Sequence, residues 1–429
     1  MTIFTFAVGI DGAPSAKEIQ VQVEKELSAI VSKLKRDSTK WTDASFGPND
    51  KDPFGALSLY GKIGTPDSVG LSKYPSPESL TWERPVYDDD HFPNLTPGDQ
   101  NTEEEKEDDY GFGPQRNDET DSFCTHGRLF IDGSSSGDVV QGQLGDCWFL
   151  GALAVMGSRE ELILKCFWKL DSFKEYGLYV CVFYKDCSVK YVVIDDRLPI
   201  VSKTKRLIFS SGRDPNELWV PLIEKAYAKL HGCYRSLIGG YSHYALGDLT
   251  GFSPRMIGLK PGTMGFSEEL SDEHLWSILS AHKLWGSLMG CSIQATPGSA
   301  AKVEADAGCG LHTGHAYSLL DLGEITLPDE SKVKLLKIRN PWGKGEWEGP
   351  WSDRSEEREK YDEQIVKTFG RDDKTSHELL EVNFQDGTFF VSFADWRERF
   401  TSLFMAATFP NTWIRKRITG QWEGDIGGK

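Results

Sequence analysis

The apolar residues of the chain recur with recognisable periods. Between residues 15 and 36 they follow steps of three and four, at Ile19, Val23, Leu27, Ile30 and Leu34. This period predicts an amphipathic helix that packs on the body of the protein or on a partner. From Trp148 to Met156 almost every residue is apolar, and the run is too long and too rich in Ala and Leu for an ordinary strand. We therefore predict a buried helix over this run.

The rest of the pattern changes character near the middle of the chain. The first half has a helical pattern at 217–231, a capping box at 158–161 that predicts another helix start, and strand-like runs at 178–184 and 191–194. The second half has one helical pattern at about 272–284 and otherwise strand-like runs, at 287–294, 316–320, 333–338, 388–393 and 403–408. A helical core followed by a strand-rich core predicts an α+β fold of two lobes with a cleft between them.

Composition excludes several classes of protein. A net charge of −17 argues against nucleic acid or an anionic membrane as the main partner, and the surplus carboxylates leave material for calcium sites. The 8 cysteines include no C-x-x-C pair, which excludes zinc-finger and thioredoxin-type motifs and is typical of reduced thiols. The chain has neither a basic signal-peptide start nor an apolar run of about 18 residues. We therefore predict a soluble, cytoplasmic protein with no transmembrane segment.

Cys147 is the strongest candidate for a nucleophile. Gly142 and Gly145 form the approach to the buried helix, Asp146 can cap it, and Cys147 falls in its first turn. The partial positive charge at a helix N-terminus lowers the pKa of a thiol from about 8.5 toward about 4–7. A cysteine beside apolar residues is also a common small core residue. The polar, glycine-rich approach favours a sulfur at the helix mouth.

A thiolate nucleophile needs a base, and the base needs a group that orients it. His315 stands among small residues at the start of a predicted strand, and His312 is the competing candidate. The next predicted strand can pair back on that strand as a hairpin, which brings Asn340 near His315. The Asn340 oxygen can then accept the imidazole N–H and fix its tautomer, and Trp342 can shield this bond from water. Taken alone, an Asn-Pro pair is also a common turn sequence.

Three sequence blocks together resemble the catalytic blocks of the calpain family, which are papain-like cysteine endopeptidases with a Cys-His-Asn triad. The blocks are Gln141-Gly142-x-Leu144-Gly145-Asp146-Cys147-Trp148, Gly314-His315-Ala316-Tyr317-Ser318 and Arg339-Asn340-Pro341-Trp342-Gly343. Further blocks agree: Trp82-x-Arg84-Pro85, Asp195-Asp196-Arg197-Leu198-Pro199, Glu224-Lys225-Ala226-Tyr227-Ala228-Lys229, Gly232-Cys233-Tyr234 and Gly239-Gly240. The resemblance spans about residues 40–410 in the family's order. It implies a papain-like protease core of two subdomains, with the Cys helix in the helical first lobe and the His and Asn in the β-rich second lobe.

The resemblance also implies roles for individual residues. Cys147, His315 and Asn340 would form the triad, and the side chain of Gln141 would join the Cys147 backbone N–H in the oxyanion hole. An amide donor just ahead of the nucleophile's helix can physically reach a developing oxyanion. The substrate-binding residues implied are Gly240, Gly314 and Trp342, the two glycines holding an extended substrate by their backbone.

The implied function is that of a calcium-dependent thiol protease. Such a hydrolase makes limited cuts in intracellular proteins through a thioester acyl-enzyme on Cys147. One alternative is a catalytically silent calpain-like calcium-binding module that acts by binding partners, and the retained triad and Gln141 weigh against it. Another is a Cys-His acyltransferase of transglutaminase type, which favours Asp as the third member.

One calcium site in each lobe is implied as well, and the two sites together align the lobes. The matching ligands at the first site are the side chains of Asp138 and Glu217 and the carbonyls of Ile131 and Gly133. At the second site they are the side chains of Glu346, Asp353 and Asp386 and the carbonyl of Phe384. Carboxylates and carbonyls are the ligands of a hard cation such as Ca²⁺. Each acid by itself is equally compatible with an ordinary surface position.

The chain departs from the family at two linked positions. Thr388 stands where the family usually has a glutamate, so the second site has one anionic ligand fewer. Ser136 stands where the family often has the arginine that pairs with this glutamate. Both members of an inter-lobe ion pair are thus absent together, which avoids a stranded charge. We expect altered or weaker calcium coupling between the lobes, with both sites still able to bind.

The predicted domain division has four parts. Residues 1–66 form an N-terminal anchor helix and extended segment, and 67–251 form the first protease subdomain, with a solvated acidic insert at about 99–110. Residues 252–410 form the second subdomain. Residues 411–429 resemble the entry strand of the C2-like β-sandwich that follows the core in many calpains, so we expect a truncated product or a core fragment without that domain.

Overall fold

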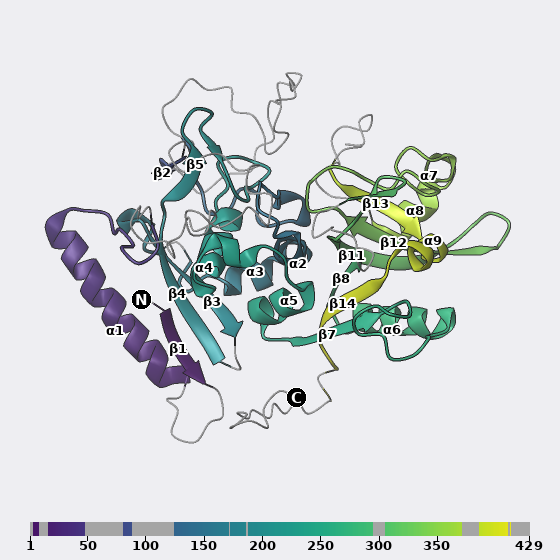
Figure 1. Cartoon of the computed structure of the whole chain (residues 1–429), viewed down its shortest axis with the longest axis horizontal. Helices are drawn as coiled ribbons and strands as arrows, with labels where there is room; N and C mark the ends of the chain where they lie inside the picture. Colours follow the sequence, from purple (N-terminus) through teal and green to yellow (C-terminus); the bar gives the residue numbers. More distant parts are fainter. Residues whose placement is uncertain are drawn as a thin grey trace, which may run out of the picture.

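The molecule has two lobes that lie side by side (Figure 1). The computed structural model describes residues 3–7, 16–47, 80–87, 124–170, 172–185, 188–294, 305–370, 386–410 and 412. The acidic insert at about 99–110, Phe384 and residues 413–429, on which expectations were stated above, lie outside these ranges. Within them the protein mixes helices and strands, and the predicted α+β class is confirmed.

The first lobe combines helices with two small antiparallel sheets. One sheet has the order β1-β4-β3 and the other the order β2-β5-β6. The strands are β1 (Ile3–Ala7), β2 (Leu80–Glu83), β3 (Leu178–Lys185), β4 (Ser188–Asp195), β5 (Leu198–Val201) and β6 (Arg206–Leu207). The helices are α1 (Ala16–Asp37), α2 (Cys147–Gly157), α3 (Glu160–Lys165), α4 (Trp219–Leu230) and α5 (Ser242–Thr250), with 3₁₀ turns η4 (Ser136–Asp138), η5 (Lys174–Tyr176) and η6 (Tyr234–Leu237). The sequence pattern predicted β3 and β4 but not the second sheet.

Helix α1 follows the predicted amphipathic range almost residue for residue. Its buried residues Val23 and Leu27 pack in one cluster with Leu178, Val180 and Val193 of β3 and β4. The apolar stripe of α1 therefore covers a sheet of the first lobe, so the helix packs on the body of the protein.

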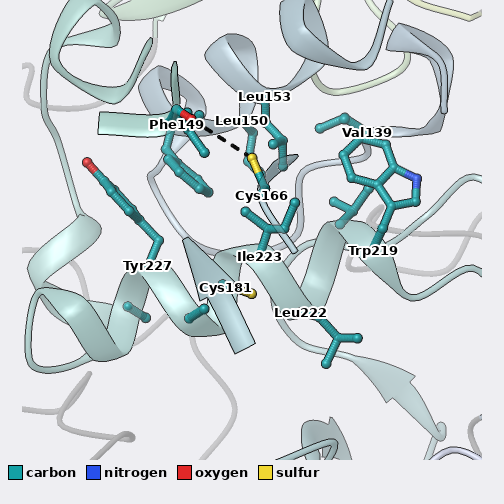
Figure 2. Packing of buried hydrophobic residues seen from close by; sticks show 14 of the residues in the cluster. Val139, Phe149, Leu150, Leu153, Cys166, Cys181, Trp219, Leu222, Ile223 and Tyr227 are labelled. Atoms are coloured by element: carbon teal, nitrogen blue, oxygen red, sulfur yellow. Dashed lines mark hydrogen bonds between the residues drawn. The ribbon is translucent and has the colours of Figure 1, made fainter. Parts of the chain in front are cut away.

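Helix α2 is buried along its whole length, as its uninterrupted apolar sequence predicts. Figure 2 shows Phe149, Leu150 and Leu153 of this helix in a cluster with residues of α4 and with Cys166. The ring of Phe149 stacks on that of Tyr227, with 4.3 Å between centroids and 8° between planes. Close packing on all sides fixes the helix axis and therefore the direction in which its first turn points.

The second lobe is built on one antiparallel sheet of six strands in the order β13-β12-β11-β8-β14-β7. These strands are β7 (Ser253–Gly258), β8 (Leu288–Ile293), β11 (His315–Thr326), β12 (Lys332–Arg339), β13 (Thr388–Ser392) and β14 (Ser402–Ala407), and β9 (Ala305–Gly308) with β10 (Leu311–Thr313) form a separate pair. The helices of this lobe are α6 (Asp272–Leu284), α7 (Glu356–Lys360), α8 (Asp362–Phe369) and α9 (Phe393–Arg399). The strand-like runs predicted in the second half all correspond to strands of the large sheet.

The predicted hairpin is present. Strands β11 and β12 pair antiparallel, with Ser318 opposite Arg339 and Leu319 opposite Ile338, and the register shifts before Asp321. The pairing leaves His315 at the start of β11 and Asn340 just beyond the end of β12. Both residues therefore lie at the same end of the paired strands.

The predicted capping box at the start of α3 is wrong. The N-cap residue of α3 is Arg159, and no side-chain bond caps the helix there. The hydroxyl of Ser158 instead donates to the carbonyl of Val155 at 2.7 Å. Because α2 ends directly before α3, Ser158 completes the end of one helix and does not begin the next.

The two lobes share apolar core. The cluster around α2 includes Leu288 of β8, Ala316 of β11, and Phe404 and Ala406 of β14. Figure 1 shows α2 and α5 next to the sheet of the second lobe. The sheet and the cysteine helix are therefore positioned against each other by direct packing. The division of the chain at residue 251 stays a prediction.

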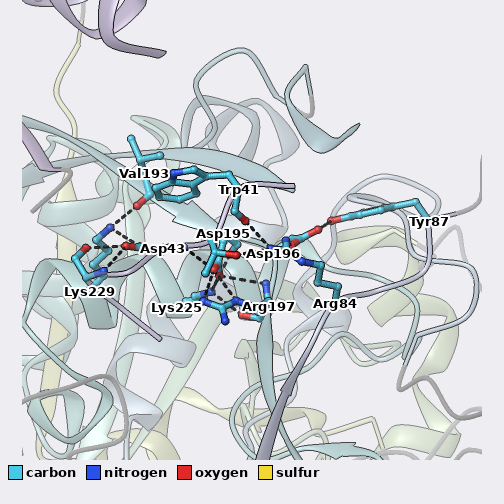
Figure 3. Close-up of polar contacts among 12 residues, drawn as sticks. Trp41, Asp43, Arg84, Tyr87, Val193, Asp195, Asp196, Arg197, Lys225 and Lys229 are labelled. Atoms are coloured by element: carbon cyan, nitrogen blue, oxygen red, sulfur yellow. Dashed lines mark hydrogen bonds and ion pairs between the residues drawn. The ribbon is translucent and has the colours of Figure 1, made fainter. Parts of the chain in front are cut away.

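A buried ionic network attaches the segment after α1 to the first lobe (Figure 3). The ammonium of Lys229 lies 2.5 Å from Asp43 and donates to the carbonyl of Val193. Lys225, also on α4, lies 2.5 Å from Asp195. The Asp43 amide donates to the same Asp195 carboxylate. The network ties residues 41–47 to the body through charged groups that are almost completely buried.

The structure also bears on membrane insertion and on disulfide bonds. Among the residues described, no helix has both the length and the apolar character that crossing a bilayer requires. The cysteines within the described ranges all carry thiols.

Candidate active site

Cys147 is the first residue of α2, as predicted. Asp146 occupies the N-cap, and its carbonyl accepts the amides of Phe149 and Leu150 at 2.8 and 3.1 Å. Cys147 is 7% exposed, whereas Phe149 and Leu150 are completely buried. The thiol therefore stands where the helix reaches the edge of the core, at the positive end of the helix dipole.

The prediction that Asp146 caps the helix holds for its position but not for its side chain. Its carboxyl group makes no hydrogen bond to the amides of the first turn. It is completely buried. The N-terminus of α2 thus lacks the side-chain hydrogen bond that an N-cap Asp usually provides.

The helix of Cys147 rests directly on the strand of His315. The hydroxyl of Ser318 donates to the carbonyl of Gly151 at 2.8 Å. A side-chain carbon added to Gly151 would lie 3.6 Å from the carbonyl oxygen of Ala316. Gly151 is about one turn beyond Cys147, and Ala316 directly follows His315. The same inter-lobe contact therefore positions the sulfur and the imidazole.

His315 is oriented by Asn340, as the hairpin argument predicted. The Nε2 atom of His315 lies 2.8 Å from Oδ1 of Asn340. The amide of Trp342 donates to the same Oδ1 at 3.1 Å, and Nδ2 of Asn340 donates to the carbonyl of Gly345 at 2.9 Å. These two bonds fix which end of the Asn340 amide is the oxygen. Because Oδ1 only accepts, Nε2 carries the hydrogen, and Nδ1 is the basic nitrogen of the neutral ring.

Aromatic rings surround this hydrogen bond. The ring of Trp342 lies 4.4 Å from that of His315 between centroids, and the ring of Tyr317 lies 4.8 Å away. His315 is 1% exposed, and Asn340 is completely buried. The bond between them is therefore shielded from water, as expected for Trp342. The ring of His312, the competing candidate, also contacts the ring of Trp342, with 4.5 Å between the two centroids.

Gln141 contacts both the loop that leads to Cys147 and the second lobe. Its backbone amide donates to the carbonyl of Pro341 at 3.2 Å, next to Asn340 in the chain. Its side-chain Nε2 donates to the carbonyl of Leu144 at 2.8 Å, inside the approach loop. An amide nitrogen carries two hydrogens, so this bond leaves Nε2 a second donor.

Gly240 and Gly314 have backbones that side chains would disturb. A side-chain carbon on Gly240 would lie 2.4 Å from Cε2 of Trp148, the residue after Cys147. The Trp148 indole is held by a 2.7 Å bond to the carbonyl of Leu237. Gly314 has a φ of +67°, and its amide donates to the carbonyl of Ile293 at 2.7 Å. Both positions therefore require glycine for local reasons, and their role in holding a substrate stays a prediction.

The residues expected at the first calcium site lie around one loop. The Glu217 carboxylate accepts the amide of Ile131 at 2.9 Å. The Asp138 carboxylate accepts the hydroxyl of Ser135 at 2.7 Å. Asp132 and Gly133 have φ values of +58° and +85°, so the loop turns sharply between Ile131, which binds Glu217, and Asp138. Both carboxylates are buried and make hydrogen bonds within the loop.

The acids expected at the second site influence one another. Burial raises the pKa of Glu346 to about 7, with a further contribution from Asp353. Burial also raises the pKa of Asp353 to about 6, and Asp386 adds to the rise. The three carboxylates therefore share one region of negative charge that a cation would relieve. In the described part of the chain, no group of three His, Cys, Asp or Glu side chains converges closely enough to hold a metal ion. The residue types thus fit Ca²⁺, but their side chains are not drawn together as a ligand set.

Arg339 is a residue to which the sequence argument gave no role. It is almost completely buried and donates to the carbonyls of Val139 at 3.0 Å and Gly137 at 3.1 Å. These carbonyls belong to the first lobe and flank Asp138, while Arg339 directly precedes Asn340. Thr388 is its cross-strand neighbour on β13. A charged residue in the last position of a predicted strand, directly before a candidate catalytic residue, was the available signal.

Comparison with known proteins agrees with this geometry. The model of the family described as calpain family cysteine protease matches residues 87–407. Calpain-5 of Mus musculus is 35% identical over 323 residues, which cover 70% of this chain and 48% of the mouse protein. The Calpain-type cysteine protease DEK1 of Arabidopsis thaliana is 37% identical over 305 residues, which cover 70% of this chain and 13% of the plant protein. Calpain-8 of Rattus norvegicus is 33% identical over 310 residues, covering 70% of this chain and 40% of the rat protein. The chain thus spans about half the length of calpain-5 and less of the others.

Proposed function

The chain belongs to the calpain family of cysteine proteases, and from this premise we propose that it is an active endopeptidase with Cys147 as its nucleophile. The observation that carries the proposal is the support given to the base. His315 is hydrogen-bonded to Asn340, and its strand packs on the helix that begins with Cys147. A silent binding module would need none of this arrangement, and the retained triad argues against that alternative.

The proposed reaction has two covalent steps. The Cys147 thiolate attacks the peptide carbonyl carbon, and the oxyanion accepts hydrogen bonds from the Cys147 N–H and from Gln141. The C–N bond breaks as His315 gives its Nδ1 proton to the leaving amine, which leaves a thioester on Cys147. Water then attacks the thioester while neutral His315 takes its proton, and the thiolate is released with the carboxylic acid product.

The roles of the surrounding groups follow from their positions. Asn340 keeps the Nε2 hydrogen of His315 engaged, so Nδ1 is the nitrogen that exchanges protons. The positive end of α2 favours the thiolate form of Cys147. Gly240 and Gly314 would accept the backbone of an extended peptide, which implies unfolded or exposed segments of intracellular proteins as substrates. Limited cutting of such segments, in a reducing compartment such as the cytoplasm, fits a protein whose described cysteines are thiols.

Calcium is proposed as the regulator of this activity. Asp138 and Glu217 with the carbonyls of Ile131 and Gly133 would hold one ion. Glu346, Asp353 and Asp386, together with the carbonyl of Phe384, would hold the other. Bound cations would neutralise each group of acids and stabilise the loops that carry them. Arg339 supports this proposal, because its positive charge is attracted by Asp138 of the first group and by Asp386 of the second. A change in charge at either group would therefore act on Arg339.

We further propose that coupling between the two calcium sites is weaker here than in relatives with an inter-lobe Arg–Glu pair. Ser136 and Thr388 occupy those two positions. The double variant Ser136→Arg with Thr388→Glu should make the calcium dependence of peptide hydrolysis steeper, and each single variant serves as its control. A calcium titration of the double variant that matches the wild type would contradict this proposal.

One experiment tests the function itself. Wild type and Cys147→Ser are assayed on casein and on a fluorogenic peptide, each with calcium and with chelator. We expect hydrolysis only by the wild type and only with calcium. Amine incorporation without hydrolysis would favour an acyltransferase of transglutaminase type, and equal activity of both proteins would exclude Cys147 as the nucleophile.

A further inference from the structure

His312, the histidine that the proposed mechanism does not use, lies beside the rings that enclose His315. Its ring contacts that of Trp342, with 4.5 Å between centroids, and its centroid lies 6.4 Å from that of His315. The backbone N–H of His312 donates to the hydroxyl of Tyr317 at 2.9 Å. The rings of Trp342 and Tyr317 both contact His315. Through two different groups, His312 therefore contacts two aromatic residues that flank the base.

Of these two aromatic residues, Tyr317 is the more firmly held. It is completely buried, and its ring contacts those of Phe400 and Phe389, with 5.5 and 6.3 Å between centroids. Trp342 is only partly buried and lies in the loop that follows β12. The bond to the Tyr317 hydroxyl therefore fixes the backbone of His312 to the core of the second lobe. The ring of His312 is then placed to restrict the movement of Trp342.

The strand that carries His312 depends on such contacts. Strand β10 pairs only with β9, and an isolated pair of strands is marginally stable. The turn of this hairpin is attached where the amide of Glu348 donates to the carbonyl of Cys309 at 3.0 Å. The end of β10 is attached where the amide of Gly314 donates to the carbonyl of Ile293 at 2.7 Å. His312 lies between these two attachments and directs the hairpin against the base.

We propose that His312 is a positioning residue: its backbone is anchored to Tyr317, and its ring holds the Trp342 indole against His315. The indole then keeps water away from the hydrogen bond between His315 and Asn340. This proposal rests on the proposed role of His315 as the base. Water that reached the bond would compete for Oδ1 of Asn340 and for the Nε2 hydrogen, and the imidazole could then leave its catalytic orientation.

Solvent exchange of the Nε2 hydrogen of His315 measures this shielding. It is followed by NMR in protein containing isotope-labelled histidine, and the signal is assigned by its absence in His315→Ala. His312→Ala removes the ring but keeps the backbone N–H, whereas His312→Phe keeps an aromatic ring at the same place. A contact between two aromatic rings shifts a local opening equilibrium by about 2- to 12-fold.

We expect exchange to be about 3–10-fold faster in His312→Ala and within about twofold of the wild-type rate in His312→Phe. His274, an exposed histidine of α6, provides the matched control, and His274→Ala should leave the rate unchanged. In peptide hydrolysis, His312→Ala should lower kcat by about 3–10-fold with KM within about twofold, because the base and not substrate binding is affected. His312→Phe should restore kcat.

The exchange measurement needs no substrate. A wild type that hydrolyses no peptide would therefore contradict the proposed function, while the exchange rates would still decide the role of His312. Unchanged exchange in a folded His312→Ala, equal acceleration in His312→Phe, or exchange too fast to detect in the wild type would overturn the proposal. If His312→Ala does not fold, Tyr317→Phe decides. It removes only the hydroxyl that anchors His312 and should also accelerate exchange, so an unchanged rate there would overturn the proposal.

Discussion

Arg339→Met is the substitution that most directly tests how the lobes hold the active site together. Arg339 extends from the end of β12 into the first lobe and donates to the carbonyls of Gly137 and Val139. Methionine keeps an unbranched apolar stem in the same space but offers no donor. The two carbonyls flanking Asp138 would lose their partner, and the segment that continues into Asn340 would lose its attachment to the other lobe.

The magnitude follows from the bonds. A hydrogen bond to a charged group contributes about 1.5–3 kcal/mol, so two bonds give a gross contribution of about 3–6 kcal/mol. Burial offsets part of this, since it lowers the pKa of Arg339 to about 10 and so disfavours the charged guanidinium. We expect the free energy of unfolding to fall by about 2–4 kcal/mol. Because Asn340 follows directly, kcat/KM on the folded protein should fall about 10–100-fold.

The assay pairs two measurements on the same samples. Urea unfolding followed by circular dichroism gives the change in stability, and peptide hydrolysis at saturating calcium gives kcat/KM. Arg339→Lys is the matched control. Its ammonium keeps the charge but cannot form the same fork, so it should fall between wild type and Arg339→Met in both measurements.

A small effect would refute the reasoning. If Arg339→Met changes the free energy of unfolding by less than about 0.5 kcal/mol, the two bonds to the first lobe contribute nothing net, as is true of many exposed contacts. If stability falls but kcat/KM on the folded fraction is unchanged, Arg339 stabilises the lobes without positioning Asn340.

Three further substitutions test other contacts. Asn340→Ala should lower kcat about 100-fold with little change in KM, because the His315 ring loses its orienting bond; a proportional rise in KM would point to substrate binding instead. Gly240→Ala places a carbon 2.4 Å from the Trp148 ring and should lower stability by about 1–3 kcal/mol along with activity, so a fully active and equally stable variant would contradict the geometry. Lys229→Met leaves a buried Asp43 without its ammonium and should cost about 3–5 kcal/mol, with faster proteolytic cutting near residues 41–47; unchanged cutting would show that other contacts hold this segment.

The long, strongly periodic elements could be predicted from sequence for a clear physical reason. Helix α1 has one apolar stripe and helix α2 is apolar throughout, so burial alone determines both. The His315–Asn340 bond was also predictable, because an antiparallel hairpin of known strands brings the ends of its strands together.

Contacts between distant segments could not be predicted in the same way. The hydroxyl of Ser158 can cap a following helix or end a preceding one, and only the position of Val155 decides between them. Arg339 is a charged residue that sequence reasoning assigns to a surface, and its carbonyl partners lie about two hundred residues earlier in the chain.

The central claim is that Cys147 is a nucleophile activated by His315, and the reactivity of the thiols tests it most directly. Iodoacetamide is applied at limiting amounts near pH 6, and mass spectrometry compares the alkylation of Cys147 with that of exposed Cys309. We predict that Cys147 reacts at least about tenfold faster in the wild type and loses this advantage in His315→Ala. Alkylation of Cys147 no faster than that of Cys309, or equally fast without His315, would contradict the account.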